Sequence, residues 1–409
     1  MDPARHQDRH HRNGAALTPA VRLVLYSLSI AGGMQLWGRS LVDGTLVKLL
    51  SAVHGPDPYQ LPGTQTQLKS SFTGVFAIDY LLRILVVFFW EVADGSHPAS
   101  SAIGLYFLGQ YFSVLLVFYL EDSRHGARPS YVRPTLWLLL FQATGIGCAG
   151  PLWVLSHLGA SNGGSVGRMS SLKDSLERAA PLSSPHVPFL ILAALVMGYA
   201  APASLMLLPS PRVLSADSKQ FALVLWNIFP IWVLAALLGL RSVLPLARSS
   251  QQQPAGSFKD AAAVTQLRTN RRYIANMALV YAPALIVSVY SHIAVLAATV
   301  STRLFPALFR PEHLASLTPW EVFVPPLSVV AGQTVGDGTR SFMLWDQVFG
   351  YGTVGIVMLL RLRSAADAVG RPLGSVKMVT GILLASLVAG PGSACLLACW
   401  VSELLLLLG

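Results

Sequence analysis

The feature that most constrains this chain is a series of long apolar segments separated by short charged loops. A helix needs about 20 mostly apolar residues to cross the hydrocarbon core of a bilayer, and these segments have that length. The composition agrees, since 53% of the 409 residues are hydrophobic and only 12% are charged. A soluble domain with so many apolar side chains would need more charged surface to stay in solution. The sequence therefore predicts a polytopic membrane protein.

The predicted fold is an all-α bundle of about nine transmembrane helices, within a range of eight to ten. The expected spans are residues 19–37, 72–90, 101–120, 134–157, 187–208, 220–240, 274–300, 341–361 and 377–407. The last span is interrupted by Gly390, Pro391 and Gly392, so it is either one kinked helix or a re-entrant pair. We expect residues 19–409 to form a single transmembrane helical domain.

The net charge of +10 comes from 29 Lys and Arg against 19 Asp and Glu, and the basic residues lie mostly in loops. Their expected partners are membrane lipids, and their distribution favours a cytoplasmic N-terminus. No nucleic-acid partner is expected, because no soluble segment combines a basic patch with aromatic residues. Residues 1–18 predict a polar basic tail, and residues 248–273, with their Ser, Gln and Pro, predict a flexible loop.

Two connections are too apolar to be ordinary loops. Residues 41–53 are suited to an interfacial amphipathic helix, and residues 312–332 contain Trp320 and a Pro325–Pro326 break suited to the membrane surface. Each segment either roofs a cavity or simply packs at the interface.

Ionisable side chains inside the apolar segments call for an explanation, because a charge at bilayer depth is costly unless it is paired or hydrated. Asp79 and Arg83 lie four residues apart on one face of the second span, where they are expected to pair. The pair is either structural or part of a functional site.

The same helix ends with Glu91 and Asp94, three residues apart and just before Gly95. No Lys or Arg follows before residue 100, so two neighbouring carboxylates share a turn without a basic neighbour. Their repulsion is expected to raise one pKa and keep that acid protonated near neutral pH, ready to donate a proton. The alternative is an ordinary solvated acidic helix end.

The third span carries polar and aromatic side chains that pack beside this acidic turn. Gln110 is a polar group in lipid that needs a partner, and nearby glycines let another helix approach. We expect Trp90, Tyr106 and Tyr111 to line the mouth of the hairpin with the two carboxylates, where aromatic faces stabilise a cation. Plain packing is the alternative for these rings.

Asp346 lies in the eighth span beside Trp345, with no basic residue within one turn. It is therefore either neutral and hydrogen-bonded or paired across helices, with Arg83 as one candidate partner. A functional acid and a structural hydrogen bond both fit this pattern.

Several catalytic motifs are missing from the sequence. No HExxH, paired CxxC, GxSxG, Walker A, histidine-rich box or DDxxD pattern is present, which disfavours zinc, serine-hydrolase, ATP-dependent, di-iron and diphosphate-ionising chemistry. We expect neither a metal site nor an organic cofactor.

The hairpin FFWEVADGSHPASSAIGLYFLGQ, together with Trp345-Asp346, resembles the fungal integral-membrane terpene cyclases of meroterpenoid biosynthesis, such as the macrophorin, ascochlorin and ascofuranone cyclases. That resemblance implies a metal-independent isomerase or lyase of secondary metabolism. An acid protonates an epoxide or terminal alkene of a farnesyl chain on an aromatic or quinoid head, and the cation cyclises. It also implies residence in the endoplasmic reticulum membrane.

The expected site follows from the residues and this resemblance together. The general acid is expected among Glu91, Asp94 and Asp346. The residues expected to bind the prenylated substrate are Asp79, Arg83, Trp90, Tyr106, Gln110, Tyr111 and Trp345.

Two other classes of function compete with the cyclase. An ion-coupled transporter would use Asp79, Arg83 and Asp346 as a midplane site, although no inverted repeat is evident. A receptor or membrane scaffold would leave the carboxylates of the acidic turn without a role. The sequence does not predict an oligomeric state.

Overall fold

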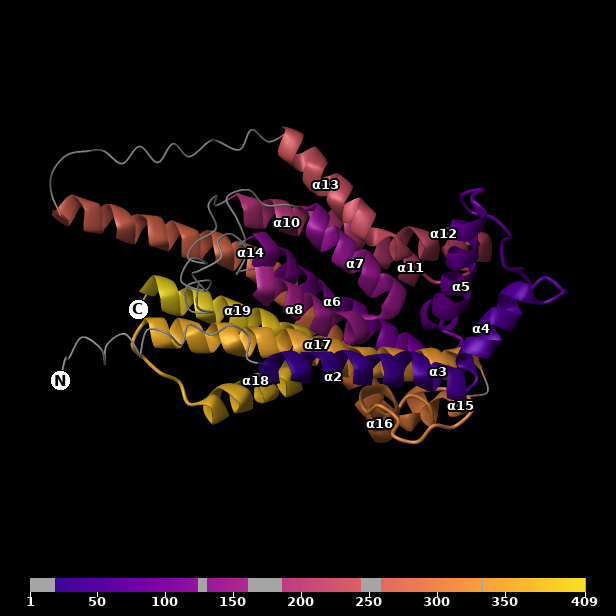
Figure 1. The fold of residues 1–409 in the computed structure, drawn as a ribbon. Coiled ribbons are helices and arrows are strands. Elements are labelled where there is room, and N and C mark those ends of the chain that lie inside the picture. The colour runs from indigo at the N-terminus through magenta and orange to yellow at the C-terminus, as the bar shows by residue number, and fades with distance from the viewer. Residues whose placement is uncertain (1–18, 124–130, 161–185, 244–258, 333, 409) are drawn as a thin grey trace.

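The protein folds as a bundle of helices in the computed structural model (Figure 1). The structure describes residues 19–123, 131–160, 186–243, 259–332 and 334–408. The predicted tail, residues 1–18, lies outside these ranges. Within them no β-strand forms, and only an isolated antiparallel bridge joins Gln60 to Gln67. The predicted all-α class is confirmed.

The helices follow one another along the chain, with a long connection at residues 55–75 between two of them. The first half contains α2 (Pro19–Gly33), η1 (Met34–Gly38), α3 (Arg39–Val42), α4 (Thr45–His54), α5 (Phe76–Ala93), α6 (Pro98–Ser123), α7 (Val132–Thr144) and α8 (Ile146–Ala160). The second half contains α10 (Val187–Leu195), η2 (Val196–Ala200), α11 (Ala201–Leu207), α12 (Ala216–Asn227), α13 (Phe229–Val243), α14 (Lys259–Leu304), η3 (Pro306–Leu308), α15 (Pro311–Leu314), α16 (Pro319–Phe323), α17 (Val335–Ala368), α18 (Ser375–Ala389) and α19 (Pro391–Leu408).

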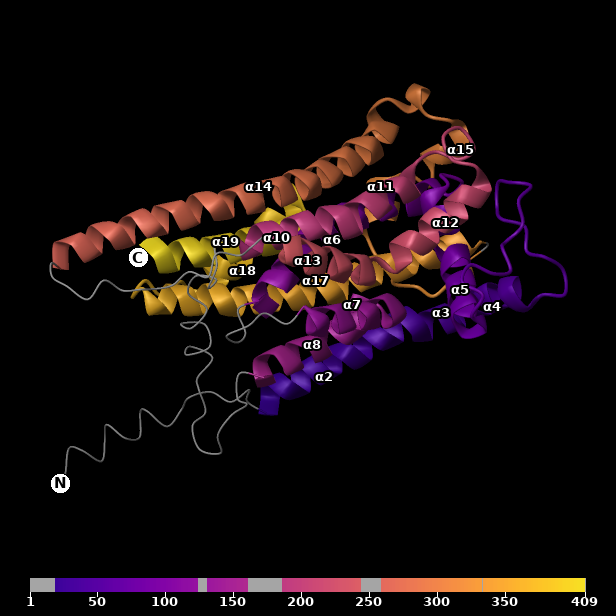
Figure 2. The ribbon, with the colours of Figure 1, turned by 90° about the horizontal axis from the view of Figure 1, so that it is seen from above.

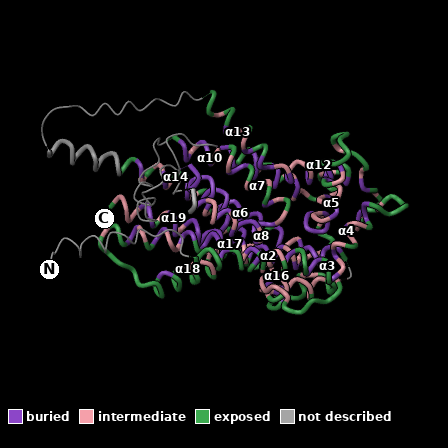
Figure 3. The backbone as a smooth tube through the Cα atoms, in the orientation of Figure 1, coloured by how far each residue is buried: buried purple, intermediate pink, exposed green. Residues whose placement is uncertain are grey.

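Helix α6 forms the centre of the bundle. Every residue from Tyr106 to Ser123 is buried, because α14, α17 and α19 pack around the helix (Figure 2). A helix that is apolar on all sides is expected either in the core of a protein or in lipid, and here neighbouring helices cover α6. Figure 3 shows this buried centre, with exposed positions concentrated on peripheral elements such as α18 and the far end of α13. The acidic turn at the start of α6 therefore rests on a rigid element.

Five helical segments are long and apolar enough to cross a membrane, and a sixth arises if α12 and α13, bent by 65°, count as one span. They are Pro98–Ser123, Val187–Leu207, Arg271–Leu304, Val335–Ala368 and Pro391–Leu408. The predicted count of about nine is not confirmed. Helix α5 is not among the five, and it carries Asp79, Arg83 and Glu91 within 18 residues.

Two of the predicted boundaries change in the structure. Gly390, with a φ of +92°, separates α18 from α19, and these two helices pack against each other, as the re-entrant alternative requires. The predicted loop at residues 248–273 is helical from Lys259 onward, because α14 begins there. Residues 244–258 lie outside the described part of the chain.

Gln110 fastens α6 to two neighbouring helices. Its Nε2 donates to the carbonyl of Ser288 in α14 at 2.6 Å, and its Oε1 accepts from the N–H of Gly392 in α19 at 2.9 Å. A Cβ at Gly392 would collide with the backbone of Gln110, so the close approach requires glycine. The predicted need for a partner is met by backbone groups, and substrate binding by Gln110 stays a prediction.

A buried ion pair joins the other end of α6 to α17. Arg361 Nη1 lies 2.7 Å and 2.9 Å from the two carboxylate oxygens of Glu121, and Arg361 Nη2 lies 3.9 Å from Glu403 in α19. A guanidinium matches a carboxylate well in this geometry, so the charges compensate each other inside the bundle. Polar contacts thus join α6 to α14 and α19 near Gln110, and to α17 near Glu121.

We predict that Gln110→Leu lowers the thermal stability of the purified protein in detergent. The substitution leaves the buried N–H of Gly392 without its partner, at a cost of roughly 1–3 kcal/mol in the free energy of unfolding, whereas the Ser288 carbonyl keeps the Ser291 hydroxyl as a donor. The exposed Gln65 is the matched control, and Gln65→Leu is expected to leave Tm unchanged. Equal Tm values for wild type and Gln110→Leu would refute the role of Gln110 as a helix fastener.

Candidate active site

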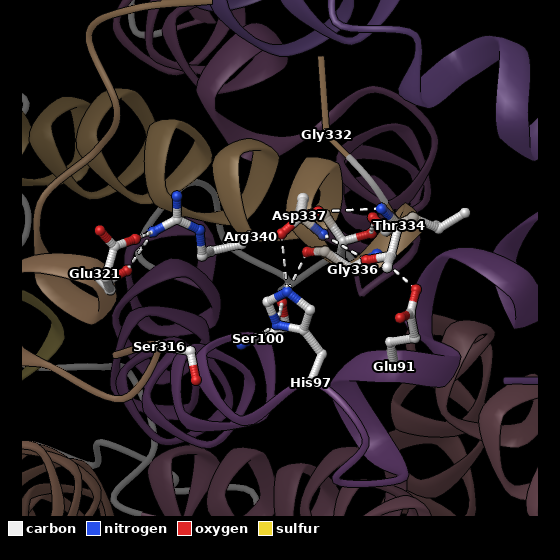
Figure 4. Close-up of polar contacts among 12 residues, drawn as sticks. Glu91, His97, Ser100, Ser316, Glu321, Gly332, Thr334, Gly336, Asp337 and Arg340 are labelled. Atoms are coloured by element: carbon white, nitrogen blue, oxygen red, sulfur yellow. Dashed lines mark hydrogen bonds and ion pairs between the residues drawn. The ribbon is translucent and has the colours of Figure 1, made fainter. Parts of the chain in front are cut away.

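The C-terminal turn of α5 meets the N-terminal turn of α17 through Glu91. Its carboxylate oxygen Oε2 accepts the backbone N–H of Gly336 at 2.6 Å (Figure 4). The first N–H groups of a helix have no partner within the helix, so they readily donate to a carboxylate. Glu91 is 5% exposed. This contact places a buried acid at the positive end of the 34-residue helix α17.

Ser100, at the start of α6, contacts the same residue, Gly336, through its carbonyl, and His97 contacts Ser100. Ser100 Oγ donates to the Gly336 carbonyl at 2.7 Å and lies 2.9 Å from His97 Nδ1. His97 Nε2 lies 3.0 Å from Asp337 Oδ1, and Figure 4 shows these groups gathered around the first turn of α17. The N–H that reaches Glu91 is therefore fixed in position by α6 as well as by α17.

Helix α17 begins with a capping box formed by Thr334 and Asp337. The N–H of Thr334 donates to Asp337 Oδ2 at 3.0 Å, and the N–H of Asp337 donates to Thr334 Oγ1 at 3.3 Å. This reciprocal pair defines where the helix starts and leaves the N–H of Gly336 for Glu91.

Glu91 lines a pocket of about 490 Å³ between α4, the loop after it and α17. Much of the wall is apolar, and it includes Val47, Ala52, Pro62 and Val335. Lys48, Ser51, Tyr59 and Thr334 supply its other polar groups. The predicted amphipathic helix at residues 41–53 corresponds to the end of α3 and to α4, and α4 contributes to this wall, which is the cavity-lining alternative. Residues 312–332 line a larger pocket beside it.

Burial raises the pKa of Glu91, although the hydrogen bond from Gly336 lowers it. The nearby charge of Asp94 raises it further, as the sequence predicted for the pair. Burial also raises the pKa of Asp94, whereas hydrogen bonds from Ser96 oppose that shift. Asp94 accepts the Ser96 N–H at 2.9 Å and its hydroxyl at 2.8 Å, and it does not line the Glu91 pocket. Of the two acids, Glu91 is therefore the one placed to reach a ligand.

The predicted ion pair between Asp79 and Arg83 is wrong. Asp79 accepts hydrogen bonds from the loop before α5, including the Ser71 hydroxyl at 2.7 Å and the Thr73 N–H at 2.7 Å. Arg83 instead donates to the carbonyl of Val53 at 3.0 Å. Asp79 lies in the first helical turn, where neighbouring backbone N–H groups compete successfully for its carboxylate. Neither residue lines the Glu91 pocket, and their role in substrate binding stays a prediction.

Asp346 lies deeper in the bundle than Glu91. Its Oδ1 accepts the N–H of Gly147 at 2.8 Å, which satisfies the structural alternative, and Arg83 is not its partner. Ten residues separate Gly336 from Asp346 along α17, which corresponds to about 15 Å at 1.5 Å per residue. The three predicted acids therefore do not converge on one site, and the midplane Asp/Arg arrangement expected of a transporter is not formed.

The predicted aromatic lining is also distributed differently. Tyr106 packs edge-on against Phe323, with ring centroids 5.2 Å apart, and Tyr111 stacks near Phe107 at 5.2 Å. Trp90 is fully buried and donates to the Pro62 carbonyl at 3.0 Å, so it supports the pocket wall from behind. None of these three predicted rings lines the Glu91 pocket.

Trp345, also predicted to bind substrate, donates its indole N–H to the Pro326 carbonyl at 3.2 Å. This contact joins α17 to the connection before it, and Trp345 does not line the Glu91 pocket. The aromatic ring that lines it, Tyr59, lies in a loop that carried no sequence signal.

The sequence analysis missed His97 and Asp337. The Thr-x-x-Asp spacing of Thr334 and Asp337 is a readable helix-start signal, and His97 belongs to the same acidic turn as Asp94. Their contact joins residues 240 positions apart, which no local pattern reveals. In the described ranges no group of three or more His, Cys, Asp or Glu side chains could hold a metal ion.

The fold and this site define a helical protein with membrane-spanning segments and a buried acid at a largely apolar pocket. The sequence profile of the CtvD domain family matches residues 21–407. The chain therefore belongs to the CtvD domain family.

Three relatives carry the name terpene cyclase. Terpene cyclase ctvD of Aspergillus terreus is 28% identical over 377 residues, which cover 92% of this chain and 97% of that protein. Terpene cyclase ascI of Acremonium egyptiacum is 29% identical over 57% of this chain and 54% of its own. Terpene cyclase penA of Penicillium crustosum is 27% identical over 70% of each chain. No solved structure matches. The resemblance seen in the hairpin is confirmed.

We predict that Gly336→Ala destabilises the protein and that Gly355→Ala, in the same helix, does not. A Cβ at Gly336 would lie 2.9 Å from the His97 ring and 3.2 Å from Glu91 Cβ, whereas nothing lies within 4 Å of a Cβ at Gly355. Overpacking of this kind costs about 1–3 kcal/mol in the free energy of unfolding. Thermal unfolding of both variants in detergent measures the difference. Equal stability would show that the turn has room for a side chain.

Proposed function

We propose that this protein is a membrane-bound terpene cyclase in which Glu91 is the proton donor. The observation that carries the proposal is the buried Glu91 carboxyl, which is bonded to Gly336 at the edge of a largely apolar pocket. Family membership and the names of its relatives support the reaction class. The substrate is a lipophilic meroterpenoid precursor with a prenyl, in particular a farnesyl, chain.

The reaction begins when protonated Glu91 gives its proton to an epoxide oxygen or to a terminal alkene carbon of that chain. Opening of the C–O bond, or use of the alkene electron pair in a new C–H bond, leaves a carbocation. The next double bond attacks this carbon and forms the ring. Loss of a proton then yields an alkene, so the product is an isomer of the substrate.

The contact with Gly336 stabilises the carboxylate that Glu91 becomes after donating its proton. The N–H already points at Oε2, and the N-terminus of α17 favours negative charge at that position. The hydrogen bond from Gly336 lowers the pKa of Glu91, whereas burial raises it by more, so the net pKa lies above the ordinary value of a glutamate.

The pocket also suits a reactive cation. Its apolar side chains, including Val47, Ala52 and Val335, limit the access of water that would quench the cation. The ring of Tyr59 offers an aromatic face that stabilises positive charge. The carboxyl group is sufficient to start this reaction, so the proposal assigns no step to a metal or organic cofactor.

The other predicted acids receive supporting roles in this proposal. The negative charge of Asp94 raises the pKa of Glu91, which makes Asp94 a positioning residue. Asp346 holds α8 against α17 through Gly147. The substrate enters from the bilayer, and we place the enzyme in the endoplasmic reticulum membrane as an isomerase or lyase of fungal secondary metabolism.

The proposal is tested by expressing the chain in microsomes and feeding a farnesylated phenol and its terminal epoxide. We expect mass spectrometry to find a product of unchanged mass and different elution time. Glu91→Gln is expected to lower its formation roughly a hundredfold or more, since it removes the general acid. Asp94→Asn should have a smaller effect, and Glu312→Gln, at an exposed acid, none. Unchanged turnover in well-expressed Glu91→Gln would refute the assigned acid, and failure of wild type to convert either substrate would refute the proposed function.

A further inference from the structure

A second pocket, of about 860 Å³, adjoins the Glu91 pocket. Gly332 and Asp337 line this larger pocket, whereas Thr334 and Val335 line the smaller one. Both pockets are therefore lined by residues at the start of α17, so a long ligand that passes over this stretch would reach both.

The two pockets differ in chemistry. The larger one has a polar side formed by Arg39 of α3 and Arg340 of α17, together with acidic groups. It is also lined by the 70% exposed ring of Trp320 in α16 and by the apolar connection after that helix, with Pro325 and Pro326. A lining that combines an aromatic ring and prolines with charged side chains suits an oxygenated ring better than an alkyl chain.

The acids that line the larger pocket already have partners. Glu321 forms an ion pair with Arg340, and Figure 4 shows this pair beside the His97–Asp337 contact. Asp43 accepts the N–H of Thr45 at 2.9 Å and its hydroxyl at 2.6 Å. These carboxylates and Arg340 thus compensate one another or bind nearby backbone.

Arg39 differs from the other charged groups of this pocket. Its guanidinium, in a residue only 7% exposed, donates to neutral acceptors, namely Ser341 Oγ at 3.0 Å and the carbonyls of Leu327 and Ser328. Within the described part of the chain Arg39 forms no ion pair with a carboxylate. The charge of Asp43 acts on Arg39 from nearby without a hydrogen bond to it, and a buried cation whose hydrogen bonds all go to neutral groups attracts an anionic oxygen.

We propose that the larger pocket binds the oxygenated end of the substrate, with a phenolate, enolate or carboxylate oxygen on Arg39 and the attached ring against Trp320. The apolar chain then extends past the start of α17 to Glu91. This inference rests on the proposed function, because it divides one substrate between the two pockets. A lipid phosphate shares the same anionic chemistry, so the test must distinguish these two sources.

The test measures equilibrium binding of two labelled probes to the full-length protein in detergent: a farnesylated hydroxybenzoate and its methyl ester. We expect wild type to bind the carboxylate at least roughly tenfold more tightly, as for a charge-assisted hydrogen bond. Arg39→Gln should abolish this preference and leave ester binding unchanged, while Arg39→Lys retains part of it. The exposed Arg310 provides the matched control Arg310→Gln, which keeps the full preference.

Trp320→Ala provides a second test that does not depend on how Arg39 supports the fold. It should weaken both ring-bearing probes and leave binding of farnesol epoxide unchanged; unchanged binding of all three would overturn the proposal. No preference in wild type, or equal weakening of both probes by Arg39→Gln, would also overturn it. A competition experiment gives a third contradicting result. If phosphatidic acid displaces the carboxylate probe from wild type but not from Arg39→Gln, and phosphatidylcholine does not displace it, the pocket binds a lipid headgroup and the proposal is overturned. Binding requires no turnover, so a failed cyclisation assay does not decide this question.

Discussion

The hydrogen bond from the Gly336 N–H to Glu91 is the contact on which the functional account depends. It joins the end of α5 to the start of α17 across 245 positions of sequence. The acid that ends an amphipathic helix thereby reaches the positive end of a membrane-spanning one. Burial alone would make Glu91 a poor proton donor, because the carboxylate left behind would have no partner. The Gly336 N–H provides that partner at the point where the charge forms.

Most buried polar groups in the described bundle serve to hold helices together. Gln110 binds backbone groups of α14 and α19, Asp346 binds the N–H of Gly147, and Arg361 pairs with Glu121. Each of these contacts is made to a protein group, as a low-dielectric interior favours. Glu91 differs because it is both bonded to the protein and placed on the wall of a pocket. That difference separates an acid available to a ligand from acids that maintain the fold.

The sequence predicted the fold class and the position of the acidic turn because both depend on local patterns. Apolar segment length indicates spanning helices, and the spacing of Glu91 and Asp94 indicates neighbouring carboxylates. The predicted partner of Asp79 was wrong because the helix start, near Phe76, exposes backbone N–H groups to that carboxylate. Sequence spacing also does not predict how far Asp346 lies from Glu91 in the bundle. It does not predict that Gly336 and His97 lie near Glu91. Those relations arise from packing between helices that are distant in the chain.

The most direct test of the central claim follows protonation of Glu91 itself. The carboxyl C=O stretch of the purified protein can be titrated by infrared difference spectroscopy and assigned by its loss in Glu91→Gln. Because burial and the Asp94 charge raise the pKa of Glu91, its band should persist to higher pH than that of an ordinary glutamate in water. Asp94→Asn should move the midpoint to lower pH, since it removes a negative charge. A Glu91 band that titrates at or below the pH of an ordinary glutamate would contradict its role as the proton donor.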